Sequence, residues 1–213
     1  MKITVFSDYV CPFCYLGSIA LKKACADLDI DIEFHPYELR RPPQPPVDPM
    51  HDPVRLKRFD EVLLPIARQL DVAMTLPWIS PHPYSTNAFQ GYYFAQQYGL
   101  GERYNQLVFE AFYVHQQNIG EIGVLCTLMR KLNLDETAFQ TALQQKTWMP
   151  QLDRQFQIRQ EFRIQGCPSY LIHQRQVSGY HSPEQFRQLI LDEAARTMTG
   201  MACGVDGCGT SEQ

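Results

Sequence analysis

Two cysteines separated by two residues, Cys11 and Cys14, lie near the start of the chain in "SDYVCPFCYLG". A short apolar run precedes them, and apolar residues at helical spacing follow them. A C-x-x-C pair beside a strand–helix–strand pattern is typical of thiol–disulfide exchange. Unpaired N–H groups and the positive end of a helix dipole stabilise a thiolate, so Cys11 at the helix start is the predicted nucleophile. Cys14, one turn further in, is the predicted resolving thiol.

A metal clip and a purely structural role are the alternatives for this pair. Structural zinc takes four ligands, whereas one C-x-x-C supplies two and no second pair lies at zinc-finger spacing. A purely structural role for two buried cysteines does not explain why Pro12 and Phe13 lie between them at a helix start. We therefore favour a redox pair, and we expect no metal and no cofactor.

The flanking periodicities predict the elements that position these cysteines. Residues 2–7 and "DIDIEFHP" alternate as strands, and the helix between them predicts parallel pairing. After residue 166, "CPSYLIH" and "RQVSGY" are two strands separated by two residues, which favours a hairpin. A last helix follows, with Ser182 and Gln185 as a capping box and Pro183 at its first position.

The middle of the chain has a different character. The segment "PPQPPVDPMHDP" (42–53) predicts a stiff, extended connection, and helical periodicity continues from there to residue 163. We assign the aromatic residues of these helices to core packing. The sequence thus predicts an α/β thioredoxin-like domain from 1–45 and 164–198. An inserted helical domain spans 46–163, and a flexible cysteine-containing tail spans 199–213.

Composition excludes some classes of function. The chain has 213 residues, is 45% apolar and 20% charged, and carries a formal net charge of −4. It lacks the basic surface that nucleic-acid binding needs, and no apolar stretch is long enough to span a membrane. The N-terminus lacks the pattern of a signal peptide, so we expect a cytoplasmic protein, with a removed export signal as the alternative. In a reducing compartment its seven cysteines indicate redox or metal chemistry, not a disulfide framework. The six histidines show no metal-binding spacing.

The chain resembles the DsbA family and, more narrowly, its cytosolic FrnE-like branch, over residues 1–198. The resemblance lies in "FSDYVCPFCYLG", in Asn87 opening an insertion helix, in "AFYVHQQNIGEIGVL" and in "IQGCPSYLIHQRQVSGYHSPEQF". It implies a thioredoxin-like fold with a large all-helical insertion. It also implies a protein disulfide oxidoreductase or isomerase, monomeric or homodimeric, that acts on protein or low-molecular-weight thiols and disulfides, glutathione among them. Pro168 would be the cis-proline beside the cysteine pair, and aromatic insertion residues would line an apolar substrate groove.

Three further cysteines are open to more than one interpretation. Members of the family usually have Val or Thr before the cis-proline, where this chain has Cys167. It is either a small apolar substitute or a third redox thiol that traps Cys11 or helps to hold a metal. In the tail "CGVDGC", Cys203 and Cys208 are predicted to form an auxiliary dithiol that exchanges electrons with the first pair. A tail without catalytic consequence and a four-thiolate metal site are the alternatives. Cys25 and Cys126 are predicted packing residues.

Two rival functions remain. Glutathione-dependent isomerases and transferases of the hydroxychromene-carboxylate and kappa types share the implied fold, but usually carry serine at the helix start. A non-catalytic metal- or thiol-sensing module is the other rival.

Overall fold

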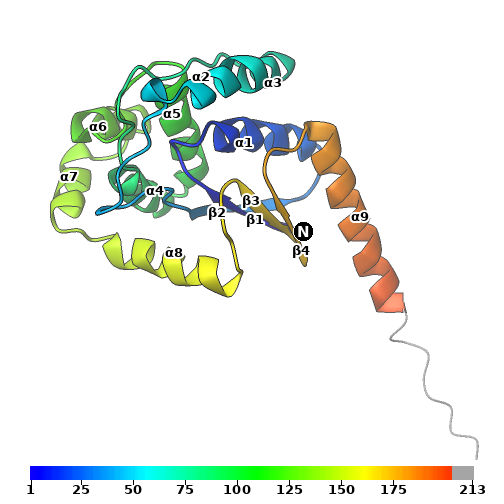
Figure 1. Cartoon of the computed structure of the whole chain (residues 1–213). Coiled ribbons are helices and arrows are strands. Elements are labelled where there is room, and N and C mark those ends of the chain that lie inside the picture. Colours follow the sequence, from blue (N-terminus) through cyan, green and yellow to red (C-terminus); the bar gives the residue numbers. More distant parts are fainter. Residues whose placement is uncertain (203–213) are drawn as a thin grey trace, which may run out of the picture.

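A mixed four-stranded sheet with the strand order β2–β1–β3–β4 organises the molecule (Figure 1). The computed structural model describes the backbone of residues 1–202 and the side chains of residues 1–197. Strand β1 (Lys2–Ser7) pairs parallel with β2 (Asp31–Pro36) and antiparallel with β3 (Ser169–Ile172). Strand β4 (Arg175–Ser178) pairs antiparallel with β3. The predicted parallel pair and the predicted hairpin are both confirmed.

Helix α1 (Pro12–Ala24) joins β1 to β2 and packs against the last helix, α9 (Pro183–Ala202) (Figure 1). The capping box at the start of α9 is confirmed. The side chain of Gln185 accepts the Ser182 N–H at 2.8 Å, and the Gln185 N–H donates to the Ser182 hydroxyl at 3.3 Å. Helix α9 continues to Ala202, so it includes residues 199–202 of the predicted tail. Residues 203–213 lie outside the described part of the chain, and the predicted domain boundaries stay a prediction.

The chain between β2 and β3 is helical, as predicted for the insertion. Its elements are a 3₁₀ turn η1 (Pro49–His51), α2 (Pro53–Arg58), a π-helical turn η2 (Phe59–Leu63), α3 (Leu64–Gln69), α4 (Thr86–Gln96), α5 (Gly101–Tyr113), α6 (Ile122–Lys131), α7 (Glu136–Gln144) and α8 (Met149–Glu161). The proline-rich segment 42–53 is therefore not extended throughout, because η1 occupies part of it. No helix in the described residues has both the length and the apolar character needed to cross a membrane.

Strand β1 separates two apolar clusters, because alternate residues of a strand point to opposite faces. Ile3 and Val5 belong to the main core, which extends through α1 and the insertion helices. Phe6 belongs to a smaller cluster with Tyr37 and Ile164. This buried strand leads directly into the loop before α1, so the first turn of α1 is held against the core.

Candidate active site

Cys11 occupies the N-cap position of α1, as predicted. Its backbone is extended (φ −95°, ψ 112°), and Pro12 takes the first helical position. The neighbouring thiols of Cys14 and Cys167, followed by backbone N–H groups of the first turn, lower the pKa of the Cys11 thiol well below its usual value, although burial opposes them. Because the ionised form is favoured there, Cys11 has the chemistry of a nucleophile.

Cys14 lies one turn further in and has the opposite character. It is 1% exposed, against 6% for Cys11, and its Sγ accepts the backbone N–H of Asp8 at 3.5 Å. Burial raises the pKa of the Cys14 thiol well above its usual value. Ionisation is therefore favoured at the outer sulfur and disfavoured at the inner one.

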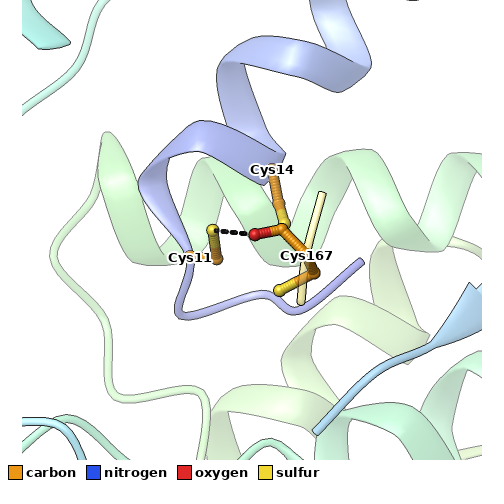
Figure 2. Close-up of side chains that lie close together, drawn as sticks. All are labelled: Cys11, Cys14 and Cys167. Atoms are coloured by element: carbon orange, nitrogen blue, oxygen red, sulfur yellow. Dashed lines mark hydrogen bonds between the residues drawn. The ribbon is translucent and has the colours of Figure 1, made fainter. Parts of the chain in front are cut away.

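A third thiol joins this pair from the segment before β3. The Sγ atoms of Cys11, Cys14 and Cys167 all lie within 4.8 Å of one another. The Cys11 Sγ also lies 3.7 Å from the carbonyl oxygen of Cys167 (Figure 2). The peptide bond between Cys167 and Pro168 is cis. The structure thus brings together the four residues that the sequence analysis selected as catalytic, although their roles stay a proposal.

A buried carboxylate, Asp8, lies beside the thiols. It was not predicted from the sequence as a functional residue. It is 1% exposed, and it accepts the backbone N–H of Leu39 at 2.6 Å, that of Val10 at 3.3 Å and the hydroxyl of Ser85. Burial is the main cause that raises the pKa of Asp8 to about 7, and these hydrogen bonds oppose it. The only sequence signal was an acidic residue inside an otherwise apolar run just before Cys11.

Two buried tyrosines add an apolar wall to the site. The hydroxyl groups of Tyr113 and Tyr170 have no hydrogen-bond partner within the described structure. The ring of Tyr113 stacks on that of Tyr15 with centroids 5.3 Å apart. Burial raises the pKa of both unpaired hydroxyls well above the usual value, and the charges of the nearby thiols add to this. The wall is therefore uncharged.

Three phenylalanines of the insertion helices pack in the core. Phe89, Phe109 and Phe112 are at most 3% exposed. The apolar substrate groove that the resemblance implies stays a prediction, while the prediction that insertion aromatics are core residues is confirmed for these three. The reason is that each packs against other insertion helices or against the loop before α1. Asn87 lies in the first turn of α4, as the resemblance implied.

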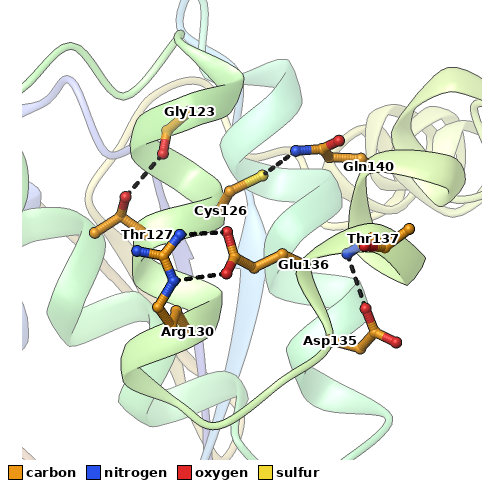
Figure 3. A network of polar contacts seen from close by, with 8 residues as sticks. All are labelled: Gly123, Cys126, Thr127, Arg130, Asp135, Glu136, Thr137 and Gln140. Carbon is orange, nitrogen blue, oxygen red and sulfur yellow. Dashed lines mark hydrogen bonds and ion pairs between the residues drawn. The ribbon is translucent and has the colours of Figure 1, made fainter.

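The cysteines outside the cluster have separate surroundings. Cys126 is 3% exposed on α6, and the amide of Gln140 donates to its Sγ at 3.3 Å (Figure 3). Cys25 is partly buried at the end of α1 and packs against the main core. Both fit the predicted packing role. Cys203 and Cys208 lie beyond the described residues, so their predicted auxiliary role stays a prediction.

The three-thiol cluster is also the place where a soft metal ion would find ligands. Within the part of the chain that the structure describes, this group of possible ligands has three members. Structural zinc takes four, so the cluster alone does not complete such a site. Its chemistry fits thiol exchange without further components.

The fold and the three clustered thiols define a protein of the thioredoxin-like class with a C-x-x-C pair at the start of α1. Residues 2–191 match the family model for the DSBA-like thioredoxin domain, and the chain belongs to that family. The FrnE-like branch within it stays a prediction. An uncharacterized protein of Bacillus subtilis (strain 168), YwbO, is 37% identical over 195 residues, which cover 91% of this chain and 97% of YwbO.

Several solved structures share the fold. A probable DsbA oxidoreductase of Streptomyces coelicolor, SCO1869, is 18% identical with a TM-score of 0.78, and the match covers 100% of both chains. A 2-hydroxychromene-2-carboxylate isomerase is 19% identical with a TM-score of 0.76, over 97% of this chain and 100% of its own. The cytosolic disulfide reductase DsbM of Pseudomonas aeruginosa, solved with GSH, is 20% identical with a TM-score of 0.65, over 95% and 100%. At these identities the likeness extends to the fold alone.

Proposed function

We propose that this protein is a thiol–disulfide oxidoreductase in which Cys11 is the nucleophile and Cys14 the resolving thiol. The observation that carries the proposal is the pairing of these sulfurs within 4.8 Å at the start of α1, with the pKa lowered at Cys11 and raised at Cys14. One thiolate beside one protonated thiol is the arrangement that exchange requires, because the thiolate attacks and the second thiol is kept in reserve.

The reaction proceeds in two displacements. The Cys11 thiolate attacks one sulfur of a substrate disulfide, forms a mixed disulfide and releases the other substrate sulfur as a thiolate. Cys14 then loses its proton and attacks the Cys11 sulfur, which releases the second substrate thiol and leaves a Cys11–Cys14 disulfide. The reverse sequence oxidises a substrate dithiol. Pro168 has a positioning role, because it fixes the segment that faces both sulfurs.

The substrates that this proposal implies are protein or low-molecular-weight disulfides and dithiols. Glutathione is the small thiol that we test first, since the DsbM structure contains it and that protein is described as a cytosolic disulfide reductase. A cytoplasmic location is part of the same proposal and is tested by cell fractionation. A monomeric or homodimeric state stays a prediction.

The deciding experiment measures reduction of a fluorescent peptide disulfide by the protein in a glutathione buffer, with mass spectrometry of the trapped intermediates. Cys11→Ser is expected to abolish turnover and mixed-disulfide formation. Cys14→Ala is expected to form the mixed disulfide at Cys11 and to release it slowly. Cys126→Ser is the matched control, because it removes a buried thiol outside the cluster. Full turnover by Cys11→Ser would overturn the proposal.

A glutathione-dependent isomerase is the second candidate, because a 2-hydroxychromene-2-carboxylate isomerase shares the fold. An isomerase needs bound glutathione but no change in the oxidation state of protein thiols. If reduced protein isomerises such a substrate with glutathione and never forms a Cys11–Cys14 disulfide in glutathione buffers, this candidate replaces the first. Metal analysis of the purified protein tests the sensing module in the same preparation.

The tail dithiol is tested separately. Cys203→Ser/Cys208→Ser is expected to slow regeneration of the Cys11/Cys14 pair if the tail passes electrons to it. An unchanged rate and unchanged metal content would remove both the auxiliary role and the four-thiolate site.

A further inference from the structure

Cys167 is held in place beside the cysteine pair by contacts on both sides. The hydroxyl of Ser169 donates to the carbonyl oxygen of Gly166 at 2.8 Å, and the N–H of Gly179 donates to that of Pro168 at 2.8 Å. These bonds tie the segment to itself and to the end of β4. The Cys167 side chain is therefore presented to Cys11 by a fixed loop.

The Cys167 sulfur lies close enough to the Cys11 and Cys14 sulfurs to react with them. Its Sγ is a member of the cluster whose three sulfurs lie within 4.8 Å, and a disulfide bond is about 2.05 Å long. Either neighbour therefore bonds to Cys11 after the two sulfurs approach by less than about 3 Å. In Figure 2 the three side chains converge on one small space, two of them from the start of α1 and one from the opposite segment.

We propose that Cys167 is a second resolving thiol, which releases substrates from Cys11 by forming a Cys11–Cys167 disulfide. The proposal rests on the thiol–disulfide exchange proposed above. Displacement at sulfur occurs along the line through the attacking and leaving sulfurs. Cys14 and Cys167 come from two different elements, so each serves mixed disulfides whose leaving sulfur lies in a different direction. A protein with both can resolve substrates that are bound in more than one orientation.

The step balances without a further oxidant. Cys167 loses its proton and attacks the Cys11 sulfur of the mixed disulfide; the Cys11–Cys167 bond forms and the bond to the substrate sulfur breaks. The substrate leaves as a thiolate and takes up a proton. The two electrons that reduce the substrate disulfide thus come from the thiols of Cys11 and Cys167. Cys14 can then attack Cys11, which forms the Cys11–Cys14 disulfide and returns Cys167 to a thiol.

The test uses the full chain with Cys203→Ser/Cys208→Ser as its background, so that tail thiols do not contribute. Cys14→Ala in this background is mixed with oxidised glutathione, quenched by acid and analysed as non-reduced peptides. We expect a peptide pair linked through Cys11 and Cys167, and release of glutathione from Cys11. Adding Cys167→Val is expected to remove the linked pair and to slow that release by at least about tenfold.

Cys126→Val in place of Cys167→Val is the matched control and is expected to leave the linked pair and the release rate as in Cys14→Ala. Circular dichroism and thermal unfolding verify that each variant is folded, and Cys167→Thr replaces Cys167→Val if the latter is not.

A glutathione adduct that persists on Cys11 of Cys14→Ala without any Cys11–Cys167 linkage would contradict this proposal and leave the Cys11/Cys14 mechanism intact. Failure of the wild-type chain to form either an adduct at Cys11 or a Cys11–Cys14 disulfide would overturn both. A metal ion recovered at one equivalent on the three sulfurs, with no such linkage, would show that Cys167 is a ligand instead.

Discussion

The carboxylate of Asp8 accepts the hydroxyl of Ser85, a residue 77 positions further along the chain. Asp8 lies in the loop that leads to Cys11, and Ser85 is the N-cap residue of α4 in the helical insertion. The backbone N–H of Asp8 also donates to the Cys14 sulfur. One buried residue therefore connects the resolving thiol to the insertion.

Removal of the Ser85 hydroxyl is expected to weaken this connection. Ser85→Ala leaves a buried carboxylate oxygen with one donor fewer, and the lost bond involves an ionisable group, so we expect a loss of about 1.5–3 kcal/mol in the free energy of unfolding. Denaturant unfolding measures it. Ser18→Ala is the control, because that hydroxyl donates to the Tyr15 carbonyl within α1 and lies near the surface. An equal effect of the two substitutions would contradict the prediction.

Stability is expected to depend on pH through Asp8. Its folded-state pKa of about 7 lies above the ordinary 3.8, so the folded protein retains a proton that the unfolded chain releases between these values. The stabilisation from this group is fully present below about pH 4 and is lost as the pH rises toward 7. Asp8→Asn has no such proton. The difference in free energy of unfolding between wild type and Asp8→Asn should therefore change by about 4 kcal/mol across that window, in favour of the wild type at acid pH.

Denaturant melts of the two proteins at matched pH values measure this difference, and all groups that both proteins share cancel. Asp8→Asn is also expected to be less stable at every pH, because an amide has one acceptor oxygen in place of two, so that either the Leu39 N–H or the Val10 N–H would face its nitrogen. Parallel stability curves from pH 4 to 7 would show that Asp8 titrates normally.

The Asp8–Ser85 contact marks the limit of what the sequence could predict here. Cys11 at a helix start, the hairpin and the Ser182–Gln185 capping box are local patterns, and each was predicted correctly. Ser85 occupies the N-cap position of α4, yet its side chain makes no capping hydrogen bond and donates to Asp8. Burial of a carboxylate without hydrogen-bond donors costs free energy of folding. Donors to Asp8 therefore come also from segments that are distant in the sequence. The need for such donors arises only when tertiary packing buries the carboxylate, so local sequence patterns do not reveal it.

The same limit applies at the site itself. The sequence identified Cys167 and Pro168 because a known architecture places that segment beside the cysteine pair. It gave no sign of Tyr113 or Tyr170, which come from α5 and β3 and meet near the thiols only in the folded chain. Apolar periodicity assigned Tyr113 to the core without indicating which part of the core contains the thiols.

Alkylation of Cys11 is expected to stay fast at pH values well below the usual thiol pKa of 9.0, because its pKa is lowered. The thiolate reacts and the thiol does not, so the rate with iodoacetamide reports the ionised fraction. Since the Cys14 thiol is the largest cause of the lowering, Cys14→Ala is expected to move the midpoint of the rate profile to higher pH. Cys11→Ser is the control for reaction at other cysteines. A midpoint near 9.0 in the wild type would rule out an activated Cys11.

Gly17 of α1 is expected to tolerate no side chain, because a side chain there would clash with the Tyr170 hydroxyl. Removal of that hydroxyl is expected to relieve the clash. A Cβ at this position would lie 2.2 Å from the Tyr170 hydroxyl oxygen, with the Pro168 ring behind it at 3.8 Å. Tyr170 is fully buried, so it has no free space into which to move. Gly17→Ala should therefore cost about 1–3 kcal/mol of stability and displace the segment that carries Pro168.

Gly17→Ala/Tyr170→Phe should restore most of that stability, because the next ring atom lies 3.6 Å from the added Cβ, an ordinary contact. The Tyr170 hydroxyl has no partner among the described residues, so its removal alone should cost little. Gly123→Ala is the matched control on α6, where nothing lies within 4 Å, and it should stabilise the protein by up to about 1 kcal/mol. Thermal and denaturant unfolding of the four variants form a double-mutant cycle with its control. If Gly17→Ala is as destabilising with Phe at position 170 as with Tyr, the steric explanation is wrong, and the glycine is required by the backbone of α1 itself.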